Sequence, residues 1–295
     1  PLASQDQIRF VSLANLFGAS TLVECFSSDG VGSVPGIKDA NNRWELRGHP
    51  QRIVSVDEQT LQLFARLYDE PGTPATQARL PALHSQQLQS VLEKFAAAPK
   101  RLGDLQGEYI ALEMWHETNA QKDGTIRRDT GFPAGPTELV LSGPHFQVGN
   151  PCFQTPKAIC NTHRAYDCLD LTSLPDDYLP RTNYHPDVSP SEYLARTPRV
   201  PWGERKPVTD FYRLAARGML SQAGERTYIP ALIPKGSGHI NGVQSTVFST
   251  TSSLISTLAF GGSLLADFFI KSTGRGNLHY TWETFPLINL SNEVS

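Results

Sequence analysis

Two stretches in the first third of the chain have the apolar spacing of amphipathic helices. A capping-box pattern at Ser55–Glu58 precedes the first stretch, and Pro71 follows it. A Pro- and Ala-rich connection leads to the second stretch, which ends before Pro99. The two apolar stripes consist of Leu61, Phe64, Leu67 and Tyr68, and of Leu88, Val91, Leu92 and Phe95. We therefore predict two helices that pack against each other.

After Gly107 the pattern changes to short apolar runs bounded by Gly, Pro and Asn, which is typical of strands in a twisted, mixed sheet. The predicted strands cover residues 109–115, 139–141, 146–148 and 166–171. Helical spacing then predicts a helix over residues 210–220, with Arg213 and Arg217 one turn apart on one face.

A long apolar element covers residues 250–271. Its apolar core of 17 residues is short for a membrane span and contains Asp267, so we expect a buried helix and no membrane partner. The elements together predict an α+β fold. Residues 1–105 form a helical or spacer region, and residues 106–295 form a mixed, β-rich domain braced by this long C-terminal helix.

Composition and charge narrow the class of protein. With 39% hydrophobic and 19% charged residues, the chain is not globally disordered. The formal charge of −3 argues against nonspecific nucleic-acid binding, but residues 195–282 hold ten basic and four acidic side chains, which gives +6 there and leaves −9 elsewhere. Such a chain can present a basic face to a polyanion, although a scatter of solvated charges would give the same count.

The cysteines indicate a reducing compartment. Four cysteines in 295 residues are too few for a disulfide scaffold, and the chain starts with proline and shows no signal-peptide pattern. We expect a cytoplasmic protein, cut from a longer polypeptide. Three cysteines lie near histidines, but their spacing is unlike that of zinc ligands and favours ordinary thiols. These residues are Cys152, Cys160 and Cys168, and His145, His163 and His185.

Catalytic motifs are incomplete. The segment His116–Asn119 begins like a zinc-protease helix, but Ala120 replaces the second histidine. Gly149–Phe153 is close to the Asn-Pro-Pro-Tyr/Phe loop of amino-methyltransferases, but Cys152 replaces the second proline. Asp29–Gly36 is a poor cofactor loop because it contains a proline and lacks an apolar helix start. We therefore expect no catalytic residue, metal or cofactor in this chain.

Two glycine-containing segments combine basic and amide side chains, at residues 228–248 and 272–287. Arginine, lysine, asparagine and glutamine match the hydrogen-bonding groups of purine edges and phosphates. We therefore interpret both segments first as segments that recognise nucleic acid. The alternative is that the glycines form tight turns and that the polar groups face water.

The order of motifs in the last third resembles the C-terminal target-recognition region of type IIG and related adenine-specific restriction-modification methylases. The residues that fill the motif are Arg226, Thr227, Pro234, Gly236, Gly238, His239, Asp267, Phe268, Gly274, Gly276, Asn277 and Pro286. The segments 107–128, 141–160 and 178–184 are similar to defence-associated methylases of the same group. The likeness begins at about Arg43, and the family's methyltransferase domain has no counterpart in this sequence.

The resemblance implies the DNA-reading part of an adenine methylase, whose S-adenosylmethionine would bind in the missing catalytic domain. Its partners would be double-stranded DNA and the methyltransferase domain of the parent chain, in a restriction-modification or phage-defence system. Gly149–Phe153 then becomes a structural turn. Two alternatives stay open: a fragment with its own nuclease or base-modifying residues, and a module for protein–protein assembly.

We predict three groups of DNA contacts. Two glycine-hinged fingers would enter the grooves, the first with Lys235, His239, Asn241 and Gln244, and the second with Arg275 and Asn277. A basic surface would hold phosphates through Arg199, Arg205 and Lys206. Further candidates are Arg127, Arg128, Arg181 and Asn183.

Overall fold

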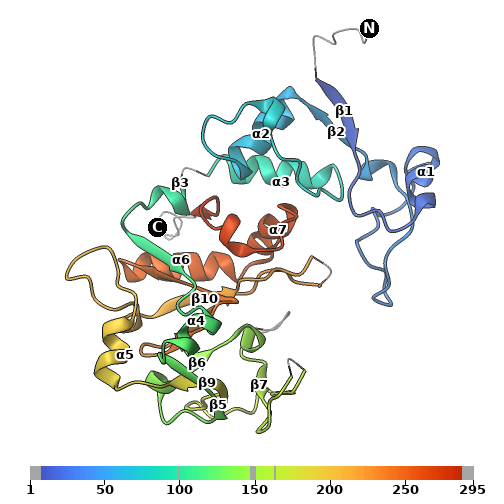
Figure 1. Cartoon of the computed structure of the whole chain (residues 1–295). Helices are drawn as coiled ribbons and strands as arrows, with labels where there is room; N and C mark the ends of the chain where they lie inside the picture. Colours follow the sequence, from blue (N-terminus) through green and yellow to red (C-terminus); the bar gives the residue numbers. More distant parts are fainter. Residues whose placement is uncertain (1–7, 99, 147–150, 163, 223, 288–295) are drawn as a thin grey trace. The chain divides into compact units, whose positions relative to one another are not determined.

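The protein is described from a computed structural model, which covers residues 8–98, 100–146, 151–162, 164–222 and 224–287 (Figure 1). The chain forms two compact units. Unit 1 contains the residues up to Arg101 together with Lys271–Gly274 and Thr284–Pro286, and unit 2 contains Leu102–Ile270 and Arg275–Glu283. Helices alternate with several small sheets, so the prediction of an α+β fold is confirmed.

Unit 1 contains a two-stranded antiparallel sheet and three α-helices. The sheet pairs β1 (Arg9–Ser12) with β2 (Val54–Asp57). The helices are α1 (Ala19–Ser27), α2 (Glu58–Tyr68) and α3 (Gln87–Ala96), with 3-10 turns η1 (Pro50–Arg52) and η2 (Ala75–Gln77) between them. At the end of this region β3 (Lys100–Arg101) pairs with β14 (Pro286–Leu287).

The two predicted helices are present and are in contact with each other. All four positions of the first apolar stripe are buried in α2, and two of the second stripe, Leu92 and Phe95, are buried in α3. The predicted cap of α2 is displaced by two residues. Ser55 lies within β2, and the Asp57 carboxylate caps the helix by accepting a hydrogen bond of 2.8 Å from the Thr60 N–H.

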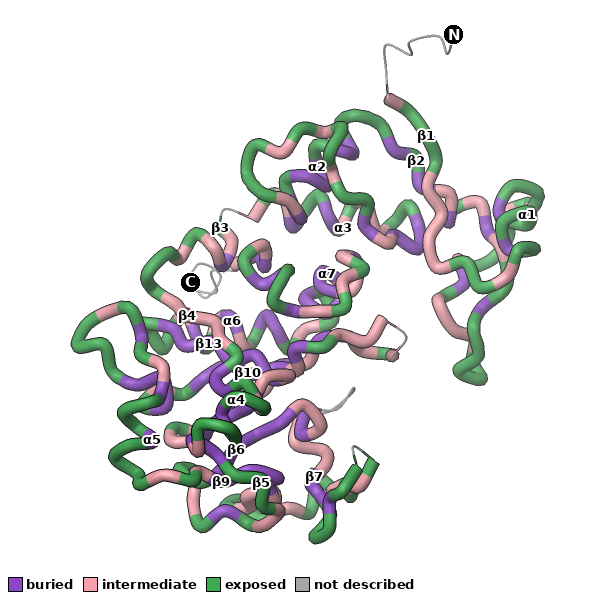
Figure 2. Tube along the Cα trace, in the orientation of Figure 1, coloured by how far each residue is buried: buried purple, intermediate pink, exposed green. Residues whose placement is uncertain are grey.

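The core of unit 2 is a four-stranded antiparallel sheet in the order β11-β10-β13-β4. Its strands are β4 (Tyr109–Leu112), β10 (Arg213–Arg217), β11 (Ala231–Ile233) and β13 (Val243–Phe248). Every residue of β13 is buried, and α6 (Thr251–Gly261) contacts both β13 and β10 (Figure 2). Because both neighbours and a helix cover β13, this strand is the centre of the unit.

Smaller elements surround this sheet. The pairs are β5 (Ile126–Gly131) with β9 (Thr182–Pro186), β6 (Val140–Leu141) with β12 (Gly238–His239), and β7 (Gln154–Pro156) with β8 (Tyr166–Cys168). The remaining helices are α4 (Glu117–Lys122), α5 (Pro190–Arg196) and α7 (Leu264–Ser272). The 3-10 turns are η3 (Leu102–Asp104), η4 (Pro136–Glu138), η5 (Gly143–Phe146), η6 (Val208–Asp210) and η7 (Leu278–Tyr280).

Two predicted helices differ in the structure. Residues 213–217 form strand β10, because hydrogen bonds to strands on both sides override the helical spacing of a short apolar run. The long C-terminal helix is divided into α6 and α7, which are bent by 77° at the break. Among the described residues, no single helix has the length and apolar composition of a membrane span, and these two satisfy such a test only as a bent pair.

Two motifs that carry the resemblance meet around Asp267 of α7. Its buried carboxylate accepts hydrogen bonds from the N–H groups of Thr227 and Tyr228, at 2.7 and 2.6 Å, and lies 3.4 Å from the Arg226 guanidinium. This carboxylate therefore holds residues 226–228, which precede β11, against helix α7. The Arg-Thr and Asp-Phe parts of the motif are therefore structural here.

Candidate nucleic-acid interface

A hairpin at residues 199–207 of unit 2, here called the basic hairpin, carries several exposed basic side chains. An antiparallel bridge joins Arg199 to Pro207, and the Val200 N–H donates a hydrogen bond of 3.0 Å to the Lys206 carbonyl. Near its tip Gly203 and Arg205 have φ angles of 56° and 52°, which reverse the chain. The ring of Trp202 meets Phe211 edge-on at 6.3 Å and attaches the tip to the core.

Basic side chains dominate this hairpin. Arg199, Arg205 and Lys206 are all exposed, and Arg199 donates a hydrogen bond of 3.1 Å to the Arg205 carbonyl. The one acidic residue of the hairpin, Glu204, lies 3.4 Å from Lys206 in a solvent-exposed ion pair. Such a pair is weakly held, so Lys206 can exchange it for a phosphate.

A second exposed lysine lies beside the hairpin, on the turn of residues 234–237, here called the Lys235 turn. The Gly236 N–H donates a hydrogen bond of 2.7 Å to the Thr209 carbonyl, and the Ser237 hydroxyl donates one of 2.8 Å to the Pro234 carbonyl. These bonds fix the turn to η6, which follows the hairpin directly. The Lys235 ammonium lies 5.4 Å from the centre of the Tyr212 ring, and within the described part of the chain it makes no ion pair.

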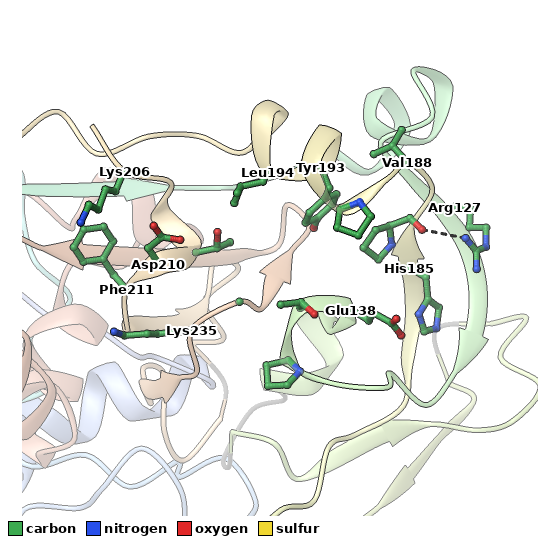
Figure 3. Close-up of a pocket in the computed structure, with 16 residues that line it drawn as sticks. Arg127, Glu138, His185, Val188, Tyr193, Leu194, Lys206, Asp210, Phe211 and Lys235 are labelled. Carbon is green, nitrogen blue, oxygen red and sulfur yellow. Dashed lines mark hydrogen bonds between the residues drawn. The ribbon is translucent and has the colours of Figure 1, made fainter. Parts of the chain in front are cut away.

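The basic hairpin and the Lys235 turn border a large cleft of about 1130 Å³. Figure 3 shows Lys206 and Lys235 at one end, on either side of Phe211, and Arg127 with His185 at the other end. Apolar side chains line the middle, among them Val188, Tyr193 and Leu194. The cleft thus combines an apolar middle with basic groups at both ends, where Glu138 and Asp210 add acidic groups to its lining.

The two ends of the cleft differ in how far their charges are neutralised. At one end Arg127 lies 3.6 Å from Asp129 and 3.5 Å from Asp187, and it donates a hydrogen bond of 3.0 Å to the Pro186 carbonyl. At the other end Asp210 is the acidic residue that lines the cleft near Lys206 and Lys235. The positive charge available to a ligand is therefore concentrated at the hairpin end.

His239 does not reach this surface, which corrects its predicted role as a DNA contact. Its side chain is 0% exposed and lies 2.7 Å from the Ser245 hydroxyl and 3.2 Å from the Ile240 carbonyl. A carbonyl only accepts, so Nδ1 donates to Ile240 and Nε2 accepts from Ser245. Burial, with the nearby charge of Arg213, lowers the pKa of His239 to about 3, so the ring is neutral.

The backbone around His239 is held on two sides, which excludes a flexible finger. The N–H groups of Gly238 and Ile240 donate to the carbonyls of the β6 region, while His239 and Asn241 exchange hydrogen bonds with the backbone of Trp115. Gly238 is needed for close packing: a Cβ there would lie 2.5 Å from the Tyr193 hydroxyl. The Gly-rich stretch is thus part of the core.

Gln244 and Asn183 are also buried, so the structure corrects their predicted DNA contacts as well. Gln244 is 4% exposed and pairs with Ala216 inside the central sheet. The Asn183 amide accepts a hydrogen bond of 3.0 Å from Thr130 and donates one of 2.9 Å to the Tyr166 hydroxyl. Their polar groups face protein partners or the core and cannot read a base edge.

The predicted residues Arg128 and Asn241 line a second, smaller cavity, on the other face of the β5–β9 ribbon. Arg127 and Arg128 are consecutive in β5, so their side chains point to opposite faces. Asn241 accepts a hydrogen bond of 2.7 Å from the Glu117 N–H. Elsewhere on the unit, the Arg181 guanidinium lies 4.5 Å from the centre of the exposed Phe132 ring.

The second predicted finger lies far from Lys235, but it lies at the same end of β10 as Asn241 and Gln244 of the first finger. Asn277 bridges Met219, beyond one end of β10, and caps η7 by accepting a hydrogen bond of 2.9 Å from His279. Lys235 follows Ile233, which pairs with Arg213 at the opposite end of that strand. At about 3.3 Å per residue, the Lys235 turn and the Asn277 bridge are roughly 20 Å apart along β10. Arg275 contacts the Tyr280 ring at 5.6 Å. Lys235 and Asn277 therefore do not lie on adjacent fingers.

The aromatic residues that shape the cleft were missed from the sequence. Trp202 and Phe211 support the hairpin, and Tyr193 lies in the cleft wall, where burial raises its pKa to about 12. The available signal was the Pro-Trp-Gly segment inside a basic run, since a turn with a large aromatic residue has to anchor that residue somewhere.

The described residues contain neither a metal-binding cluster nor a cofactor loop of the expected form. Among the described residues, no three His, Cys, Asp or Glu side chains form a group that could hold a metal ion. All four cysteines are free thiols. Asp29–Gly36 follows helix α1 and leads to a β-bridge at Lys38, which does not fit the strand-turn-helix of an S-adenosylmethionine site. Gly149 and Asn150 lie outside the described residues; Cys152 is in a turn with φ of 60°.

Comparison with known proteins leaves the family of this chain open. None of the known protein-family models matches it, and the search of curated proteins gives no match either. The likeness to target-recognition regions therefore stays a prediction from the sequence.

Proposed function

We propose that unit 2 binds double-stranded DNA through the basic hairpin and the Lys235 turn, as the specificity part of a restriction-modification or phage-defence adenine methylase. Four exposed cations support it: Arg199, Arg205 and Lys206 lie on the hairpin, and Lys235 lies on a turn that a backbone hydrogen bond joins to η6, directly after the hairpin. This cluster is the observation that carries the proposal, because phosphate contacts by Lys and Arg supply most of the affinity of a DNA-binding protein.

The shape of the hairpin supports the same assignment. Its tip is reversed by two left-handed residues and anchored by Trp202, so its cations are presented on a defined backbone. Rigid presentation reduces the entropy lost on binding. Arg127 is a weaker phosphate ligand in this proposal, since two carboxylates already neutralise it.

The exposed apolar surface of α1 favours a second function, in assembly. Leu22, Val23 and Phe26 are 42%, 67% and 62% exposed, and Leu22 and Phe26 lie one turn apart on the helix. Exposed apolar patches of this kind mark contacts with other folded domains. The methyltransferase domain of the parent chain is the partner that the resemblance suggests, and S-adenosylmethionine would bind there.

The test of DNA binding compares two variants with the same loss of charge. The first replaces Arg199, Arg205, Lys206 and Lys235 by glutamine, and the second replaces four exposed cations elsewhere, Arg66, Lys94, Lys122 and Lys157. Fluorescence anisotropy with a labelled random duplex at low salt should show an affinity loss of at least about tenfold for the first variant only. Equal losses would mean that net charge, and not this surface, attracts the DNA.

A further inference from the structure

The smaller cavity of unit 2, here called the polar cavity, has a volume of about 300 Å³, at the lower end of the range of ligand sites. It lies on the face of the β5–β9 ribbon opposite the large cleft. Polar groups from several elements converge on it, namely Glu117 of α4, Arg128 of β5, Asn183 and Tyr184 of β9, Arg217 of β10, and Asn241. Its size suits a small polar molecule.

One wall of the polar cavity is fixed by a network of hydrogen bonds. Arg128 donates to the Tyr184 hydroxyl at 3.1 Å and to the Cys160 carbonyl at 3.0 Å, and the Tyr184 hydroxyl donates to the Glu117 carboxylate. Burial, and then the Glu117 carboxylate, raises the pKa of Tyr184, so this hydroxyl keeps its proton. Arg128 and Glu117 are thereby held in place before any ligand arrives.

The lining of the cavity also includes a positive charge that makes no ion pair. Arg217 is half-buried at the end of β10, and in the described part of the chain it makes no ion pair or side-chain hydrogen bond. The carboxylate of Glu113 lies close to the neighbouring Gly218. The cavity lining therefore contains two guanidinium groups and one carboxylate, a net charge of +1.

Asn241 adds hydrogen-bond donors to the cavity lining. Its Oδ1 already accepts the Glu117 N–H, which leaves the two N–H bonds of Nδ2 for a ligand. Gly143 and Gly242 also line the cavity, and without side chains they leave space beside Arg217. The site therefore offers the guanidinium of Arg217, the amide donors of Asn241 and the carboxylate of Glu117, which accepts hydrogen bonds.

We propose that the polar cavity binds a small phosphate monoester that carries hydroxyl or amino groups, such as a sugar or nucleoside monophosphate. Arg217 and the Asn241 amide hold the phosphate, because a planar guanidinium matches two phosphate oxygens at once. Glu117 accepts hydrogen bonds from the hydroxyl or amino groups of the same ligand. This proposal does not rest on DNA binding, since the basic hairpin and the Lys235 turn contribute nothing to the cavity.

The experiment measures binding by calorimetry with three probes: inorganic phosphate, ribose 5-phosphate and adenosine monophosphate. Ribose without phosphate is the negative control. We expect binding of all three phosphates and a loss of about 10- to 100-fold in Arg217→Gln. Tighter binding of a monoester than of inorganic phosphate would support the role of Glu117. Absence of binding of every probe at millimolar concentration would overturn the proposal.

A second variant separates ligand binding from folding. In Asn241→Asp the side chain keeps an oxygen for the Glu117 N–H but loses its donors and adds a negative charge. We expect a folded protein, with an unchanged unfolding midpoint to within a few degrees, that no longer binds phosphate. Arg199→Gln, outside the cavity, should bind as the original chain does. Unchanged phosphate affinity in both Arg217→Gln and Asn241→Asp would contradict the site.

Discussion

Two glycine-containing segments of unit 2, both with residues predicted to contact DNA, differ in what surrounds them. The basic hairpin at 199–207 has exposed cations and an aromatic anchor. The stretch at 236–248 lies between β6, Trp115 and the central sheet, and its His239 and Gln244 are buried. The residues predicted to contact DNA therefore lie on the surface in the hairpin, whereas His239 and Gln244 lie in the core.

The two segments contain glycines that are needed for different physical reasons. Gly203 of the hairpin has φ of 56°, and a Cβ there would meet no atom within 4 Å, so it is needed for a turn. Gly238 has an ordinary backbone conformation but is in close contact with Tyr193, so it is needed for packing. Only the first kind of glycine marks a loop that can protrude.

The largest expected effect tests this distinction directly. Gly238→Ala places a methyl group 2.5 Å from the Tyr193 hydroxyl, which must move and weaken its hydrogen bond of 2.8 Å from the Trp115 indole. We expect the free energy of unfolding to fall by about 3 kcal/mol, measured in urea.

Gly203→Ala in the hairpin is the matched comparison for Gly238→Ala. Only the left-handed backbone resists the methyl group there, so we expect a loss of about 1 kcal/mol. Equal losses for the two variants would show that the stretch at 236–248 is no more tightly packed than the hairpin.

The buried histidine gives the next effect, in the pH dependence of stability. The folded-state pKa of His239, about 3, lies below the value of 6.5 for an ordinary histidine, so the unfolded chain binds more protons between these values. Stability from this group is complete above pH 6.5 and is lost as the pH falls toward 3. Burial lowers the pKa of His145 in the same direction.

Between pH 6 and 5 the free energy of unfolding falls as the pH is lowered. We expect this fall to be smaller in His239→Gln than in the original chain, by about 1.4 kcal/mol per pH unit. Urea titrations at a series of pH values measure this slope. His145→Gln should reduce it in the same way. If the slope of His239→Gln matched that of the original chain, His239 would be accessible to protons in the folded state and its place in the core would be wrong.

The smallest effect on stability is expected in the hairpin. Replacing Arg199, Arg205, Lys206 and Lys235 by glutamine removes exposed charges and one weak ion pair, so the free energy of unfolding should change by less than about 0.5 kcal/mol per substitution. Thermal and urea unfolding both measure this. A large loss would show that the hairpin cations stabilise the fold.

Local patterns were sufficient for some elements and not for others. The stripes of α2 and α3 follow from spacing alone, because each helix buries one face. The strand β10 was predicted as a helix, since Phe211, Leu214 and Ala215 also fit helical spacing and the strands that pair with it lie about 20 to 30 residues away in sequence. Pairing at that separation leaves no local signal.

The candidate site was predicted in part. Exposed cations of the hairpin were identified because a basic run with Pro and Gly is a surface pattern. The burial of His239, Gln244 and Asn183 was not predictable, since it depends on hydrogen-bond partners such as Ser245 and Tyr166 that only the fold brings close. Arg127 and Arg128 looked alike in sequence, and strand alternation separated them into two cavities.

The salt dependence of DNA binding tests the central claim most directly. The logarithm of the binding constant for a random duplex is measured against the logarithm of salt concentration, for the original chain and for the variant without Arg199, Arg205, Lys206 and Lys235 cations. Each lost phosphate contact reduces the slope by about 0.9, so the variant should be shallower by about 3 to 4 units. Equal slopes, or no binding of the original chain at low salt, would contradict the proposed DNA surface.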